Sequence, residues 1–181
     1  MYIFQKILLF LLLCLCGSLY AMETEPATGS DYQLGVGDKV RIQVYNEDDL
    51  NLETRVSDTG IISYPFLGNI EVLGLTPKQL EQKITSELKG DYLVNPKVSV
   101  DIVEYRQFYV NGEVRSPGGY PFEPGITIRK AISIAGGFKE RASQEKIFII
   151  REDSSSTDPF KVSLDEKVRP GDIITVEESF F

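Results

Sequence analysis

Short runs in which apolar and polar residues alternate recur along this chain, each separated from the next by turn-forming residues. Val40, Ile42 and Val44 alternate with polar neighbours, and the pattern returns at residues 98–102 and 172–176. Alternation with a period of two buries one face of a strand and leaves the other in water. Two segments with helical spacing interrupt these runs. The order of strands, helix, strands, helix and strands predicts an α+β fold made of two small β-rich units, each with one packed helix.

The first helix is predicted in the stretch LTPKQLEQKITSELKG. Thr76 is a good N-cap with Gln79 three residues later, and Pro77 suits the first helical turn. Gly90 stands where the chain needs a left-handed exit from the helix. An apolar face at helical spacing, which we expect to pack in a core, is formed by Leu80, Ile84 and Leu88.

The second helix is predicted in TIRKAISIAGGF. Thr127 is its expected N-cap, and Gly136 and Gly137 are expected to end it. The residues that fall on one side of this helix are Ile128, Ala131, Ile132 and Ala135. We again expect this side to pack in a core.

Two glycine-aspartate pairs stand directly before alternating strands. LGVGDKVRIQV begins at Leu34, and RPGDIITV repeats the pattern from Arg169. A dinucleotide-binding loop needs Gly-x-Gly-x-x-Gly opening into a helix, whereas these stretches open into strands and the third glycine is absent. Glycine permits the tight turn, and we expect Asp38 and Asp172 to accept hydrogen bonds from backbone amides two residues on. The stretches therefore predict strand starts rather than phosphate sites.

The first 21 residues are typical of a secretory signal peptide. Lys6 precedes a leucine-rich run, and a small residue stands at the expected cleavage point after Ala21. The run is shorter than the roughly twenty residues that a membrane-spanning helix needs. A lipid-anchor signal requires a small residue before its cysteine, but leucines precede Cys14 and Cys16, so ordinary cleavage is favoured. Residues 22–31 are predicted to form a flexible leader.

The composition of the remaining chain excludes several classes of site. Without the signal peptide 160 residues remain, and the net charge moves from −8 to −9 because Lys6 is lost. No histidine and no cysteine is left, which excludes a zinc site and a nucleophile activated by histidine. An acidic chain also repels nucleic-acid phosphates. We therefore expect no cofactor, no metal, no disulfide and no nucleic-acid partner.

Several motifs together resemble the bacterial outer-membrane polysaccharide export family, the Wza-like proteins. YQLGVGDKVRIQVY, VSDTGIISYPFLG, VLGLTPKQLEQKI and YLVNPKVSVDIVEY are similar to its export domain. FYVNGEVRSPGGYPFEPGITIRKAISIAGGF and RPGDIITV resemble the soluble-ligand-binding β-grasp (SLBB) module that follows in that family. The resemblance implies an export domain at residues 32–105 and an SLBB β-grasp domain at residues 106–181. The motif residues, expected to form turns and to end helices, are Gly35, Gly37, Asp38, Asp58, Gly60, Pro65, Gly68, Pro96, Gly112, Pro117, Gly118, Gly136, Gly137, Pro170, Gly171 and Asp172.

The family resemblance implies a non-catalytic role in the export of capsule or exopolysaccharide. It implies a homo-oligomeric ring in the periplasm, associated with the outer membrane and coupled to an inner-membrane polysaccharide copolymerase. Members often carry a lipidated cysteine, a second β-grasp module and a membrane-crossing C-terminal helix, none of which is evident in this sequence. We therefore expect a short member that needs a separate outer-membrane partner.

Other functions remain open at this stage. A periplasmic module that binds a glycan or a protein without forming a conduit is the main alternative, and a glycosidase is the next. A glycosidase needs two carboxylates facing each other across a sugar, whereas Asp48-Asp49 and Glu177-Glu178 are neighbours that point opposite ways on an extended chain. Among Tyr105, Tyr109, Tyr120 and Phe122, core packing competes with stacking on sugar rings. The residues proposed as glycan contacts are Tyr109, Arg115 and Tyr120.

Overall fold

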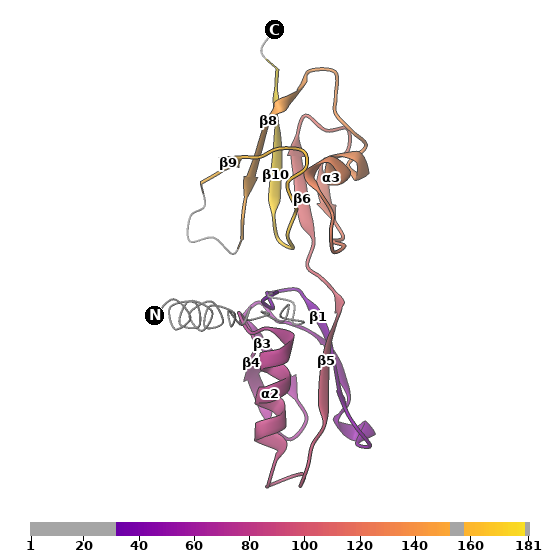
Figure 1. Ribbon diagram of the computed structural model, residues 1–181, viewed down its shortest axis with the longest axis vertical. Coiled ribbons are helices and arrows are strands. Elements are labelled where there is room, and N and C mark those ends of the chain that lie inside the picture. The colour runs from indigo at the N-terminus through magenta and orange to yellow at the C-terminus, as the bar shows by residue number, and fades with distance from the viewer. Residues whose placement is uncertain (1–31, 153–157, 180–181) are drawn as a thin grey trace, which may run out of the picture. The chain divides into compact units, whose positions relative to one another are not determined.

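The computed structural model describes residues 32–152 and 158–179, which belong to one compact unit. The predicted signal peptide (1–21) and leader (22–31) lie outside the described residues. Two hydrophobic cores follow each other along the chain, one built from residues 34–100 and one from residues 108–176. Figure 1 shows the helices and strands that carry them. No helix in the described ranges is both long and apolar enough to cross a membrane. We refer below to residues 32–105 as the N-terminal half and to residues 106–179 as the C-terminal half.

The N-terminal half contains a three-stranded antiparallel sheet, a β-hairpin and one long helix. The sheet has the order β2-β1-β5, and its strands are β1 (Lys39–Val44), β2 (Leu52–Arg55) and β5 (Val98–Glu104). A short 3₁₀ helix, η1 (Asp48–Leu50), connects β1 to β2. The hairpin consists of β3 (Ile61–Tyr64) and β4 (Gly68–Glu71), and helix α2 (Pro77–Leu88) follows it. The sheet and the helix share the first core.

Helix α2 has the start and the buried face that its sequence predicts. The Thr76 side chain accepts from the Gln79 amide, and the Gln79 side chain accepts from the Thr76 amide, so the capping box is complete. Gly90 leaves the helix with φ of 99°. The buried residues of the helix are Leu80, Ile84 and Leu88. Local capping chemistry and apolar spacing are therefore sufficient to place this element.

The C-terminal half is a mixed five-stranded sheet packed against one helix. Its strand order is β7-β6-β10-β8-β9, and β10 lies parallel to β6 but antiparallel to β8. The strands are β6 (Phe108–Gly112), β7 (Gly118–Tyr120), β8 (Ala142–Ile150), β9 (Phe160–Lys161) and β10 (Ile173–Glu178). Helix α3 (Ile128–Ile134) begins at the predicted cap, Thr127, and buries the predicted apolar side. The predicted α+β class, with one packed helix beside each set of strands, is confirmed.

The two glycine-aspartate stretches form the same turn. Gly37 and Gly171 have φ of 91° and 85°, which a residue with a side chain adopts only under strain. The Asp38 carboxylate accepts from the Gly35 amide at 2.7 Å, and the Asp172 carboxylate accepts from the Arg169 amide at 2.6 Å. Each carboxylate therefore bonds to the amide three residues before it, whereas the sequence predicted amides that follow. The predicted strand starts are confirmed, because β1 and β10 begin directly after these turns.

Asp38 also fixes the point where the N-terminal half continues into the C-terminal half. Its side chain is fully buried and accepts from the Arg106 amide at 2.8 Å and from the Arg106 guanidinium at 3.1 Å. The Tyr32 hydroxyl donates to the same carboxylate at 2.5 Å. A Cβ atom on Gly35 would collide with the Arg106 guanidinium, so a larger residue there would displace this side chain from its present position. One buried carboxylate thus holds Tyr32, the turn at Gly35 and the first residue of the C-terminal half.

We expect Asp38→Ala to lower the free energy of unfolding by about 3 kcal/mol, because it leaves the largely buried Arg106 guanidinium without its buried partner. Denaturant unfolding followed by circular dichroism measures the change. Asp172→Ala should cost a similar amount, since Asp172 occupies the equivalent turn and pairs with the buried Arg151. Asp165→Ala, which removes an exposed partner of Arg129, is the matched control and should change little. Equal stability of the Asp38 and Asp165 variants would contradict the assignment.

Candidate functional site

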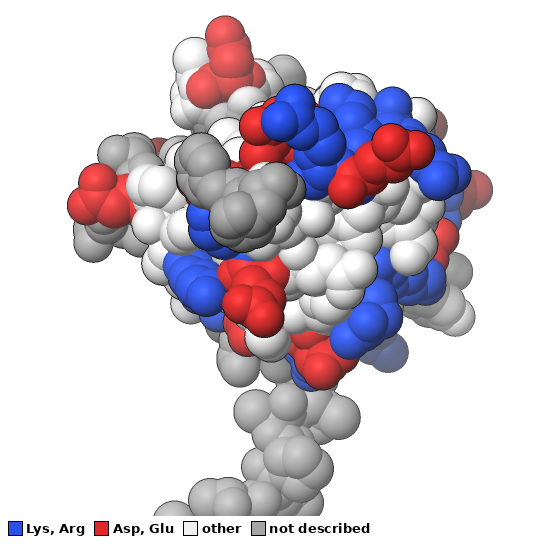
Figure 2. All heavy atoms as spheres, turned by 90° about the horizontal axis from the view of Figure 1, so that it is seen from above, with Lys and Arg blue, Asp and Glu red and all other residues white. Residues whose placement is uncertain are grey.

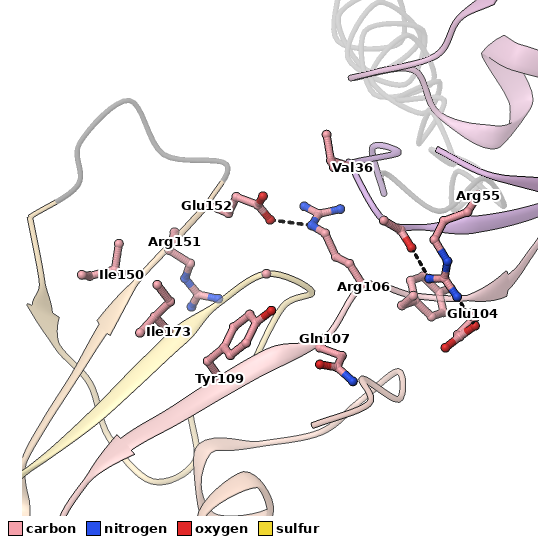
Figure 3. A pocket seen from close by; sticks show the side chains of 13 residues that line it. Val36, Arg55, Glu104, Arg106, Gln107, Tyr109, Ile150, Arg151, Glu152 and Ile173 are labelled. Carbon is pink, nitrogen blue, oxygen red and sulfur yellow. Dashed lines mark hydrogen bonds and ion pairs between the residues drawn. The ribbon is translucent and has the colours of Figure 1, made fainter. Parts of the chain in front are cut away.

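A cavity of about 700 Å³ lies between the end of β5 and the C-terminal sheet (Figure 3). Residues from both halves line it, including Val36 and Arg55 on one side and Tyr109 and Ile173 on the other. Concave sites of this size with apolar walls and a few polar groups are the usual form of a small-ligand site. We therefore take this cavity as the candidate functional site.

The apolar wall of the cavity is formed by neighbouring side chains on three strands. Ile173 of β10 is paired with Tyr109 of β6 on one side and with Ile150 of β8 on the other. The adjacent residues Phe108 and Ile174 point to the opposite face of the sheet. There they belong to the second core, together with the buried residues of α3. Tyr109 is 46 % exposed and Ile173 is 36 % exposed. This row thus offers an apolar, partly aromatic surface to a ligand.

The polar groups of the cavity are arranged as carboxylate-guanidinium pairs. The Arg106 guanidinium donates to Glu152 at 2.5 Å, and the Arg55 guanidinium donates to Glu104 at 2.7 Å (Figure 3). Arg55 also donates to the Gly37 carbonyl at 2.5 Å. Because these charges neutralise each other, the cavity presents hydrogen-bonding groups without a strong field of either sign. Such a site suits a neutral polar ligand better than an ion.

Electrostatics at Tyr32 and Arg106 reflects the buried Asp38 carboxylate. Burial raises the pKa of Tyr32 above its ordinary value of 10.0, and the hydrogen bond to Asp38 raises it further. Burial alone would lower the pKa of Arg106, but its interactions with Tyr32, Glu152 and Asp38 outweigh burial and raise the pKa. Burial also raises the pKa of Tyr105, whose ring packs edge-on against Tyr32 at 5.0 Å between centroids. This network keeps its guanidinium charged and its phenols neutral.

The side chains that line the cavity are suited to contacting a ligand. Among the described residues, no group of three or more His, Cys, Asp and Glu side chains is placed to hold a metal ion. The lining carboxylates Glu104 and Glu152 are each held by an arginine. An aromatic face beside an amide, here Tyr109 with Gln107, is a combination that can contact the apolar and polar faces of a sugar.

The three residues proposed as glycan contacts do not lie together. Tyr109 lines the cavity, whereas Tyr120 pairs with Phe108 on the other face of the sheet and packs against the second core. The Tyr120 hydroxyl donates to the Ser116 carbonyl. Arg115 lines a separate cavity with Phe138. Of the three, the structure brings only Tyr109 to the candidate site.

The other aromatic candidates pack against each other. The Tyr105 ring contacts Tyr32 and also Phe122, at 5.3 Å between centroids in an edge-on arrangement. Phe122 is partly buried against the second core. For Phe122 the structure supports packing, whereas Tyr105 both packs against these rings and lines the candidate cavity.

Sequence reasoning missed Arg106, Glu152 and Ile173 as lining residues. Ile173 could have been found, because a residue next to a core position on an alternating strand faces the other side of its sheet. Arg106 and Glu152 are 46 positions apart in the chain, and no local signal joins them. Their pairing depends on the tertiary fold.

We expect stability to fall as the pH rises above about 10. The folded state keeps the Tyr32 proton that the unfolded chain loses near its ordinary pKa of 10.0, so the stabilisation is complete below that pH and is lost above it. Tyr32→Phe should therefore reduce the alkaline slope of the unfolding free energy. The remaining slope includes Tyr64, whose pKa burial raises to about 12. Unfolding curves at several alkaline pH values measure this, and an unchanged slope in Tyr32→Phe would contradict the assignment.

Comparison with known proteins identifies two modules. Residues 26–103 match the family model described as polysaccharide biosynthesis/export protein, and residues 107–159 match the SLBB domain. The exopolysaccharide production protein ExoF of Rhizobium meliloti is 31 % identical over 142 residues, which cover 72 % of this chain and 34 % of ExoF. The EPS I polysaccharide export outer membrane protein EpsA of Ralstonia solanacearum is 28 % identical over 137 residues, covering 61 % of this chain and 36 % of that protein.

The polysialic acid transport protein KpsD of Escherichia coli is 29 % identical over 124 residues, which cover 67 % of this chain and 22 % of KpsD. The chain thus spans about a third or less of the length of these three relatives. All three are named for the production, export or transport of polysaccharides. The two modules occur in the order that the sequence motifs predict, so the chain belongs to the polysaccharide biosynthesis/export protein family, with an SLBB domain after its export domain.

Proposed function

We propose that this chain is a non-catalytic subunit of a conduit that exports capsule or exopolysaccharide across the periplasm and outer membrane. The observation that carries the proposal is the export module followed directly by the SLBB module, both within the matched part of the chain. The relatives named for polysaccharide export and transport support the same class of cargo. The signal-like N-terminus supports passage across the inner membrane into the periplasm.

A non-catalytic role is supported by how the charged groups of the cavity are used. Glycoside hydrolysis needs one carboxylic acid and one carboxylate directed at the sugar. In the cavity, Glu104 and Glu152 are directed at arginines instead, at 2.7 and 2.5 Å. The site is therefore suited to contacting a chain that passes rather than to cleaving it.

Self-association is supported by an exposed apolar group at the tips of two loops in the N-terminal half. Phe66 and Tyr92 are 68 % and 49 % exposed and stack at 5.8 Å between ring centroids, and Val94 is 91 % exposed. Phe66 has φ of 63°, an unusual conformation for a residue with a side chain. Exposed apolar groups of this kind are typical of protein contacts. We propose that they contribute to a head-to-tail interface that closes into a ring.

The proposed partners follow from this role. They are the polysaccharide itself, further copies of the chain, an inner-membrane polysaccharide copolymerase and a separate outer-membrane protein. The proposed location is the periplasm, in association with the outer membrane. The domain boundary at residues 105/106 is part of the same proposal and is supported by the separate cores on its two sides.

Deletion of the chain in its own bacterium should abolish polymer at the cell surface, and restoring it should return the polymer. The measurement compares polysaccharide outside the cell with polysaccharide retained inside. Strains that lack any second export protein provide the control for redundancy. Unchanged surface polymer in such a strain would contradict the conduit.

The purified chain without its signal peptide should form closed oligomers that Val94→Ser shifts toward the monomer, because the substitution removes exposed apolar surface from the proposed interface. Sedimentation velocity at several concentrations measures the assembly. Ile134→Ser, at an exposed position on α3, is the matched control and should leave it intact. A chain that stays monomeric but binds a defined oligosaccharide saturably would favour the alternative, a periplasmic binding module.

A further inference from the structure

A second cavity lies wholly within the C-terminal half, at the tip of the β6-β7 hairpin. It has a volume of about 610 Å³ and is lined by Glu113, Arg115, Phe138, Lys139, Glu140 and Arg141. Five of these six side chains are charged, and three are cations in a chain whose net charge is −8. Figure 2 shows Lys and Arg at the top, right and left of the face in view, with Asp and Glu between them. This is a local departure from the acidic character of the chain.

The cations of this second cavity differ in how they are used. Lys139 pairs with Glu113 at 3.6 Å. Arg115 and Arg141 have no ion pair or side-chain hydrogen bond with any residue in the described ranges, and both are exposed. They contrast with Arg55, Arg106 and Arg151, whose guanidinium groups are all held by carboxylates. Two open guanidinium groups therefore line this cavity, opposed by the single unpaired carboxylate of Glu140.

The backbone that carries these two arginines is fixed. The Arg115 amide donates to the Gly137 carbonyl at 3.1 Å, and the Lys139 amide donates to the Glu113 carbonyl at 3.1 Å. The Ser179 amide donates to the Arg141 carbonyl at 2.7 Å, which ties this residue to the end of β10. Binding a ligand here requires ordering of side chains only, which keeps its entropic cost low.

We infer that this second cavity binds a carboxylated sugar residue, such as a uronic acid, of the exported polymer. A guanidinium group matches a carboxylate with two parallel hydrogen bonds. The partly buried Phe138 ring offers an apolar surface for the sugar ring beside them. A cavity of this volume accommodates a small ligand. The inference rests on the proposed function for the identity of the ligand, but the binding itself is tested on the purified chain.

The test titrates the chain without its signal peptide with an oligoglucuronate, using an uncharged oligoglucan of equal length as the reference probe. The oligoglucuronate should bind more tightly, and its affinity should fall with added salt. Arg115→Gln and Arg141→Gln should each weaken it about tenfold, because each removes one charged hydrogen-bonding partner. Binding of the uncharged probe should not change in either variant.

Arg129→Gln is the matched control, since it removes one exposed arginine that already pairs with Asp165 outside the cavity. It should leave oligoglucuronate binding unchanged. Thermal unfolding of each variant verifies that the fold is retained. The inference is overturned if the acidic and uncharged probes bind alike, or if Arg129→Gln weakens binding as much as the cavity variants do. Because this assay needs no export, its failure leaves the deletion experiment to decide the conduit independently.

Discussion

The buried carboxylate of Asp38 is the interaction on which the arrangement of the cavity depends. A charge without access to water must be paired and hydrogen-bonded, or the fold loses several kcal/mol. Here the amides of Gly35 and Arg106, the Tyr32 hydroxyl and the Arg106 guanidinium all serve this one group. Satisfying this carboxylate fixes the position of Arg106, two residues before the start of β6. The orientation of β6 then decides that Tyr109 faces the cavity and Phe108 the core.

The Asp172 turn repeats this arrangement, and the dipeptide Arg151-Glu152, directly after β8, connects the two turns. These two adjacent side chains pair with different partners. Arg151 donates to Asp172 at 2.8 Å, while Glu152 accepts from Arg106 at 2.5 Å. A Cβ on Gly171 would collide with the Glu152 carboxylate, as one on Gly35 would with Arg106. A larger residue at either glycine would therefore displace a charged side chain from its present position.

The features that the sequence predicted well are those that depend on residues close together in the chain. The cap at Thr76, the apolar stripe of α2 and the left-handed exit at Gly90 depend on residues within one helix, and all three are as expected. The direction of the aspartate bonds was wrong, because the turn brings the preceding amide closer than the following ones. The hydrogen bond from the Arg106 amide to Asp38 joins residues 68 positions apart, so no local sequence pattern indicates it. Likewise, Tyr109 and Tyr120 are equivalent by residue type, but strand register places them on opposite faces of the sheet.

The two cavities differ in whether their guanidinium groups are paired with carboxylates, and both arrangements suit the proposed transport of a polymer. At the first, every guanidinium is already neutralised by a carboxylate, so the row formed by Tyr109, Ile173 and Ile150 is the surface left open to a ligand. At the second, Arg115 and Arg141 remain open but exposed, and salt screens exposed charges beyond about 8 Å at physiological ionic strength. Neither arrangement favours very tight binding. Weak contacts of both kinds would hold a passing chain in register while still allowing each sugar to leave.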